Sequence, residues 1–120
     1  MVFNMSYFTG SLIPNFVPTD VKNGYDICHK IEDWNKMEEL LKKTPYYVYF
    51  EEWSKQNSLT SPCNLFIMKK KMFEEYCEFV FPILFTLEKQ VDLTGRDLYQ
   101  KRALAFLSER LTSLFIYCKV

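Results

Sequence analysis

The sequence predicts a mainly α-helical domain of the α+β type, in which about four helices surround one short buried strand. The chain has 120 residues, a usual size for one domain, and its 48% hydrophobic and 18% aromatic residues suffice for a core. From Ile31 onward apolar residues recur mostly at steps of three and four, the period of a helix. The stretch at residues 64–68 is instead continuously apolar, as in a strand buried on both faces. Because the chain has so many aromatic rings, we expect some aromatic surface to remain uncovered by the domain itself. A partner, a missing domain or a ligand would bind there.

Two regions are expected along the chain. Residues 1–27 contain Gly10, Pro14, Pro18 and Gly24 and show no sustained period, which predicts an irregular N-terminal arm. Residues 28–120 form the helical domain.

The first two helices of this domain follow from their start signals. One begins near Ile31, where Glu32 and Asp33 in the first turn complement the helix dipole. The next begins at Thr44 and Pro45, which fit an N-cap and a first helical residue, and it ends at the polar stretch 55–62.

Two longer helices complete the domain. In the first, Pro82 predicts a kink or a break, because proline removes a backbone donor. Its predicted core stripe is Phe73, Cys77, Val80, Leu84, Leu87 and Val91, widened by Met72, Tyr76, Phe79 and Ile83. A turn at residues 92–95 follows, and Asp97 with Gln100 resembles a capping box for the last helix. The apolar seam of that helix is Ala103, Leu107, Leu111, Leu114 and Cys118.

Composition argues against several classes of function. Fifteen basic and fifteen acidic residues cancel, so no net positive field attracts nucleic acid. Four cysteines without C-x-x-C spacing and one histidine do not predict a metal site, and reduced thiols favour the cytoplasm. The longest uncharged apolar run, residues 79–87, is about half the length of a membrane span.

Few residues suggest catalysis. Glycine-rich phosphate loops and D-x-D pairs are missing from the sequence. His29 is a candidate general base oriented by Glu32 or Asp33; the alternative is a histidine that caps the start of a helix. Glu109 and Arg110 lie on the last helix beside apolar residues. Glu109 is a candidate catalytic base in a cleft, or an exposed or salt-bridged glutamate. Asn64 is a candidate ligand contact at the strand end, or a turn cap.

Five ordered blocks resemble the C-terminal part of a bacterial family of capsular and exopolysaccharide glycosyltransferases, long classified as a domain of unknown function. The blocks lie within residues 28–116: 29–34, 64–70, 75–78 with 84–85, 87–89, and 106–111. The resemblance implies a fold similar to the acceptor-side half of a GT-A-type glycosyltransferase. It also implies that Glu109, with Arg110 beside it, is the base that activates the acceptor hydroxyl, and that Asp33, Trp34 and Asn64 contact substrate.

The hypothesis from the sequence is therefore a partial or truncated glycosyltransferase of polysaccharide synthesis. We expect no cofactor in this chain; a missing N-terminal half or a second chain would bring the nucleotide sugar and a divalent metal. The remaining partner would be a saccharide acceptor. The rival hypothesis is a noncatalytic helical module that binds a protein through its aromatic surface.

Overall fold

The computed structural model describes residues 8–10, 12–14, 20–56, 58–60 and 66–119, and most of them are helical. The mainly α-helical class predicted from the sequence is confirmed. The α-helices are α1 (Val21–Cys28), α2 (Ile31–Leu41), α3 (Phe50–Ser54), α4 (Lys70–Gln90) and α5 (Ala103–Lys119). The 3-10 helices η1 (Pro45–Tyr49) and η3 (Gln100–Arg102) precede α3 and α5.

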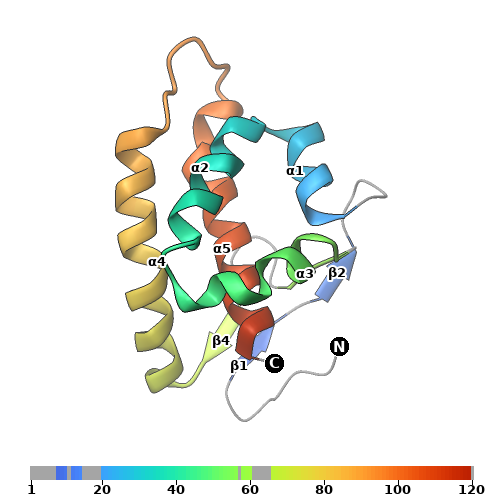
Figure 1. Ribbon diagram of the computed structural model, residues 1–120, viewed down its shortest axis with the longest axis vertical. Coiled ribbons are helices and arrows are strands. Elements are labelled where there is room, and N and C mark those ends of the chain that lie inside the picture. Colours follow the sequence, from blue (N-terminus) through green and yellow to red (C-terminus); the bar gives the residue numbers. More distant parts are fainter. Residues whose placement is uncertain (1–7, 11, 15–19, 57, 61–65, 120) are drawn as a thin grey trace.

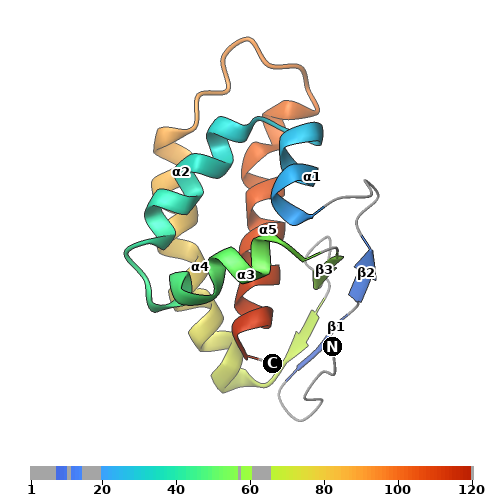
Figure 2. The ribbon, with the colours of Figure 1, turned by 45° about the vertical axis from the view of Figure 1, so that its right-hand side comes forward.

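Helix α5 lies at the centre of the molecule, and the other helices pack around it (Figures 1 and 2). Leu107, Leu111, Leu114 and Phe115 of α5 are completely buried. Apolar burial of this kind is the main force that holds helices together, so α5 organises the core. Buried side chains of the other elements complete it: Val21, Tyr25, Trp34, Met37, Leu41, Phe50, Trp53, Phe79, Val80 and Leu87.

Four short strands form two antiparallel pairs among the residues that the structure describes. Strand β1 (Phe8–Gly10) pairs with β4 (Phe66–Met68), and β2 (Leu12–Pro14) pairs with β3 (Ser58–Thr60). The prediction of one strand buried on both faces is wrong, because the side chain of Ile67 in β4 is 69% exposed. A short apolar run does not reveal whether one face or both faces of a strand are covered.

The segment predicted to be an irregular arm ends in a helix. Helix α1 starts at Val21, where the side chain of Asp20 accepts a hydrogen bond of 2.8 Å from the backbone of Asn23. Val21 and Tyr25, four residues apart, are both buried. The N-cap and this single apolar pair stabilise the helix. The helix is too short for a helical period of apolar residues to be recognised in the sequence.

Helix α4 is continuous through Pro82, so of the predicted kink or break, the break is wrong. The proline ring is exposed, and the hydroxyl of Thr86 donates a 2.9 Å hydrogen bond to the Pro82 carbonyl. The buried face lies on the widened side of the predicted stripe, at Tyr76, Phe79 and Ile83, whereas Phe73 is 46% exposed. Large apolar residues surround most of this helix, so their spacing alone does not identify the inner face. The residues buried within it are Tyr76, Phe79, Val80, Ile83 and Leu87.

The predicted capping box before the last helix is half confirmed. The carboxylate of Asp97 accepts a 2.8 Å hydrogen bond from the backbone of Gln100, as predicted. The amide of Gln100 instead donates to the carbonyl of Cys28 at 2.8 Å. This contact ties the start of α5 to the end of α1.

Candidate functional site

Four of the residues singled out from the sequence come together around the buried ring of Tyr25. The rings of His29 and Trp34 lie 4.8 Å and 5.6 Å from the Tyr25 ring. The guanidinium of Arg110, from α5, lies over the same ring at 5.2 Å, a cation–π contact. Asp33 precedes Trp34 on α2, and its side chain is 1% exposed. The site therefore unites α1, α2 and α5, and we call it the Tyr25 cluster.

The Tyr25 cluster contains four buried polar atoms without a hydrogen-bond partner among the described residues. They are the Tyr25 hydroxyl, Nδ1 of His29, Nε1 of Trp34 and Nε of Arg110. Buried polar atoms are almost always paired, so four such atoms in contacting side chains are unusual. Burial also raises the pKa of Tyr25, so its hydroxyl remains a proton donor.

An ion pair closes one side of this cluster. The guanidinium of Arg96 donates two hydrogen bonds to the carboxylate of Asp33, at 2.6 Å and 2.9 Å. Both side chains are largely buried, which favours a bidentate pair. Asp33 therefore anchors the turn between α4 and α5, and its charge is satisfied within the protein.

His29 is placed to be a neutral hydrogen-bonding group. Its ring stacks on Phe106 at a centroid distance of 3.9 Å and on Tyr99 at 5.8 Å. Burial, together with the positive charge of Arg110, lowers the pKa of His29 to about 4. The imidazole is thus uncharged near pH 7, and it is a weaker base than an ordinary histidine.

The lowered pKa of His29 predicts a loss of stability in mild acid. Between pH 6.5 and pH 4 the unfolded chain binds the imidazole proton and the folded chain does not, so stability falls as pH falls through this window. Partial exposure reduces the expected loss to about 1–2 kcal/mol. The variant H29F keeps the ring contacts and should lose less stability. Urea unfolding at pH 7 and pH 4.5 measures this difference; equal losses in both proteins would contradict the assignment.

Glu109 lies beside the Tyr25 cluster, on α5. Its carboxylate is 3.4 Å from the guanidinium of Arg110, and its side chain is 19% exposed. The Arg110 guanidinium also donates to the carbonyl of Phe106 at 3.3 Å. Glu109 and Arg110 thus form an adjacent ion pair at the edge of the cluster.

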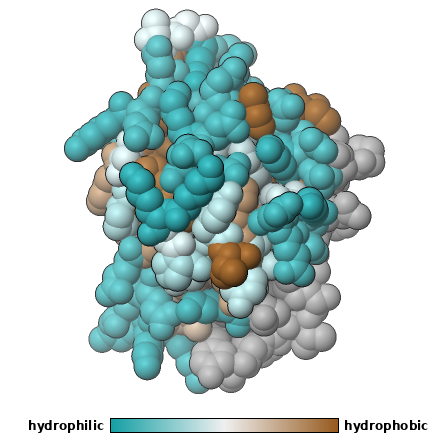
Figure 3. Space-filling view, in the orientation of Figure 1, coloured by the Kyte–Doolittle hydropathy of each residue, from teal (hydrophilic) through white to brown (hydrophobic). Residues whose placement is uncertain are grey.

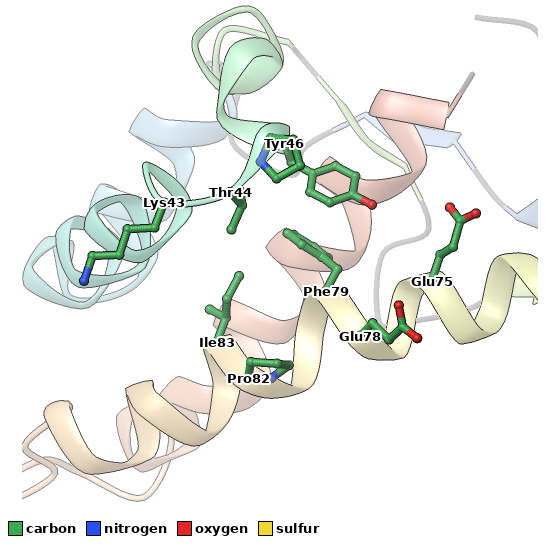
Figure 4. A pocket seen from close by; sticks show the side chains of 9 residues that line it. Lys43, Thr44, Tyr46, Glu75, Glu78, Phe79, Pro82 and Ile83 are labelled. Carbon is green, nitrogen blue, oxygen red and sulfur yellow. The ribbon is translucent and has the colours of Figure 1, made fainter.

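A second feature is an open groove of about 360 Å³ between η1 and α4 (Figure 4). The Tyr46 and Phe79 rings lie 4.5 Å apart in its wall. The carboxylates of Glu75 and Glu78 point to the same side of α4, whereas Lys43 points away from them. The lining residues are Lys43, Thr44, Pro45, Tyr46, Glu75, Glu78, Phe79, Pro82 and Ile83.

The sequence did not indicate this groove, because its walls come from segments about thirty residues apart. The ammonium of Lys119 lies 2.8 Å from the Glu75 carboxylate and over the Tyr46 ring. This contact lowers the pKa of Glu75. Glu75 is therefore charged and partly neutralised, while the Glu78 side chain is exposed.

Other predicted groups are distributed as follows. Asn64 lies outside the described residues. The described residues contain no group of three His, Cys, Asp or Glu side chains arranged for a metal ion. Among the described helices, none combines the length and the apolar character that a membrane span requires.

Comparison with known proteins gives one match. A model of the family described as a domain of unknown function (DUF4422) matches residues 11–119. The chain belongs to the DUF4422 family. The DUF4422 match begins before α1, within the segment that the sequence had assigned to the N-terminal arm. Neither a curated protein nor a solved structure matches the chain.

Proposed function

We propose that this chain is the acceptor-side part of a nucleotide-sugar-dependent glycosyltransferase of polysaccharide synthesis, and that it is inactive alone. Two observations support the proposal. The first is that five ordered blocks of the sequence resemble capsular glycosyltransferases. The second is that the lining of the groove between η1 and α4 suits a saccharide. The groove carries the proposal, because it is an open concave surface with both aromatic and carboxylate groups.

The groove suits a saccharide for chemical reasons. Sugar hydroxyls donate hydrogen bonds, and the carboxylates of Glu75 and Glu78 accept them. The apolar C–H face of a sugar ring can pack on Tyr46 and Phe79, whose rings lie together in the groove wall. The groove therefore offers both kinds of contact that a polyhydroxylated ring requires.

The same groove is unsuited to the diphosphate of a nucleotide sugar. Two carboxylates repel a phosphate, and the ammonium of Lys119 is already paired with Glu75. Donor binding, and any divalent metal that neutralises the leaving diphosphate, would come from a missing N-terminal half or a second chain.

The base for transfer is part of this proposal. Glu109 does not line the groove, and its carboxylate lies beside Arg110 on α5. A reaction at the groove would take its base from Glu78, which is exposed there, or from the missing half. Glu109 would serve only an acceptor that approaches α5 outside the groove.

Saccharide binding tests the proposal. In saturation-transfer NMR with a panel of neutral and acidic oligosaccharides, we expect at least one to bind with a dissociation constant of about 1 mM. E78Q should weaken that binding about fivefold or more, because a charged acceptor of hydroxyl hydrogen bonds is lost. E32Q, at an exposed glutamate of α2 outside the groove, is the matched control. If the panel contains no ligand, or E78Q and E32Q behave alike, the proposed acceptor site is wrong.

Donor binding tests incompleteness separately. Calorimetry of the full chain with UDP-sugars should give no measurable heat, because two carboxylates line the groove and Lys43 points away from them. Micromolar affinity for a UDP-sugar would show that this chain holds a donor site itself.

A second candidate function is a noncatalytic helical module that binds a protein. The exposed aromatic side chains of α4 favour it, since Phe73, Phe81 and Phe85 are each more than 40% exposed. For either function we propose a cytoplasmic location. The free thiols of Cys28, Cys77 and Cys118 support it, because reducing compartments preserve thiols.

A further inference from the structure

An apolar stripe runs along the outer face of α4. Phe73, Cys77, Phe81 and Phe85 follow one another at steps of four, so they form one inclined row on the helix. The three phenylalanines are 46%, 45% and 61% exposed, and the Phe81 and Phe85 rings stack at 5.9 Å. Figure 1 shows α4 at the left margin of the molecule, with α2 and α5 on its other side. We call this row the α4 stripe.

The α4 stripe can be compared with the face of the molecule that Figure 3 shows. The face in Figure 3 is mostly hydrophilic, and its hydrophobic residues occur in separate small patches. Single exposed apolar residues are normal, but several aligned aromatic rings on one helix usually mark an interaction site.

Opposite charges end the stripe. Lys70 and Glu88 are both exposed, and they are eighteen residues apart, about five turns of an α-helix. They therefore project in the same direction as the middle of the stripe. Lys70 and Glu88 are each nine residues from position 79, which is also the midpoint of the stripe from Phe73 to Phe85. The two charges are therefore placed symmetrically about the centre of the stripe.

We propose that a second copy of this chain packs antiparallel on the α4 stripe. The antiparallel arrangement brings Lys70 of each copy to Glu88 of the other, and Cys77 to Phe81. A parallel arrangement would bring Lys70 to Lys70 and Glu88 to Glu88, and like charges would oppose it. The pattern is self-complementary, as a two-fold interface requires. The inference rests on α4 alone and is independent of the transferase proposal.

The exposed area predicts a weak dimer. A phenylalanine side chain buries about 150–250 Å², so three half-exposed rings supply roughly 300 Å² per copy. A stable interface buries about 800 Å² per partner. We therefore expect a dissociation constant of about 10–100 µM, because neighbouring polar side chains add area but little affinity.

Sedimentation velocity from 5 µM to 500 µM should show a monomer converting to a dimer. The variant F81E/F85E should remain monomeric over this range, since its carboxylates would be buried against Cys77 and Phe73 of the other copy. Its thermal midpoint at low concentration should match that of the wild type, because both rings are exposed in one chain. V48E, at a 76% exposed position of η1, is the control and should dimerise normally.

Charge reversal tests the orientation. K70E or E88K should each raise the dissociation constant about threefold to tenfold, and K70E/E88K should restore it. Restoration is specific to the antiparallel pairing, because a parallel dimer would keep like charges together in the double variant. A monomer at 500 µM would overturn the proposal and assign the stripe to a different polypeptide. Dimerisation unaffected by F81E/F85E, or lack of restoration by the double reversal, would overturn it as well.

Discussion

Replacement of Asp33 by asparagine is expected to lower the free energy of unfolding by about 3 kcal/mol, although the two side chains have nearly the same shape. The Asp33 side chain is 1% exposed, and both of its oxygens accept hydrogen bonds from Arg96. The variant D33N leaves the Arg96 guanidinium, itself only 11% exposed, without its counter-ion. The cost arises mainly from this uncompensated charge. Removing one partner of a buried ion pair destabilises a protein more than replacing both partners by uncharged groups.

A double-mutant cycle separates this cost from a general effect on α2. R96Q removes the charge that D33N leaves behind, so D33N/R96Q should be less destabilised than the sum of the two single variants. E32Q is the matched control, since Glu32 is the exposed neighbour of Asp33 in the first turn. It should change stability by less than about 0.5 kcal/mol. If urea unfolding gives D33N and E32Q similar values, the ion pair does not anchor the turn between α4 and α5.

The sequence predicted where several helices begin and which face of α5 is buried, because these signals are local. Helix α2 begins at Ile31, and the η1 turn begins at Pro45, as their start signals indicated. The seam of α5 is buried at Leu107, Leu111 and Leu114, because one face of that helix was clearly apolar from Ala103 onward.

Features that depend on distant partners were not predictable in this way. Strand β4 pairs with β1, about sixty residues earlier in the chain, and neither short segment has a pattern that selects the other. The inner face of α4 is set by contact with α2 and α5, and its own sequence is apolar on most sides. Phe73 therefore belonged to the predicted core stripe and is nevertheless 46% exposed.

The candidate site was predictable to the extent that its residues are sequence neighbours. His29, Asp33 and Trp34 lie within six residues, so a shared location followed from the start of α2. Tyr25 and Arg96 were missed. Tyr25 lies in a helix whose apolar residues show only a weak helical period. Arg96 pairs with Asp33, which lies sixty-three residues earlier in the sequence. An arginine in a turn is ordinarily solvated, so only the fold reveals its partner.

Trp34→Ala should cost about 3–5 kcal/mol, the typical loss when a buried large aromatic ring is truncated. The Trp34 side chain is completely buried and stacks on Trp53 with an interplanar angle of 2° at 5.6 Å. It also contacts Tyr25 and Phe50, so the cavity would open between α1, α2 and α3. Phe73→Ala, at a half-exposed ring, should cost less than about 1 kcal/mol.

The milder variant Trp34→Phe distinguishes the two roles of the Trp34 indole, as a packing group and as a polar group. Phenylalanine keeps most of the ring contacts but removes Nε1, which is buried without a partner among the described residues. Both variants remove Nε1, so W34F should lose clearly less stability than W34A because of the ring packing that phenylalanine keeps. Thermal and urea unfolding of both variants measure the difference. Equal losses would mean that the ring contacts kept by phenylalanine contribute little to stability, and a loss below about 1 kcal/mol for W34A would contradict the core position of Trp34.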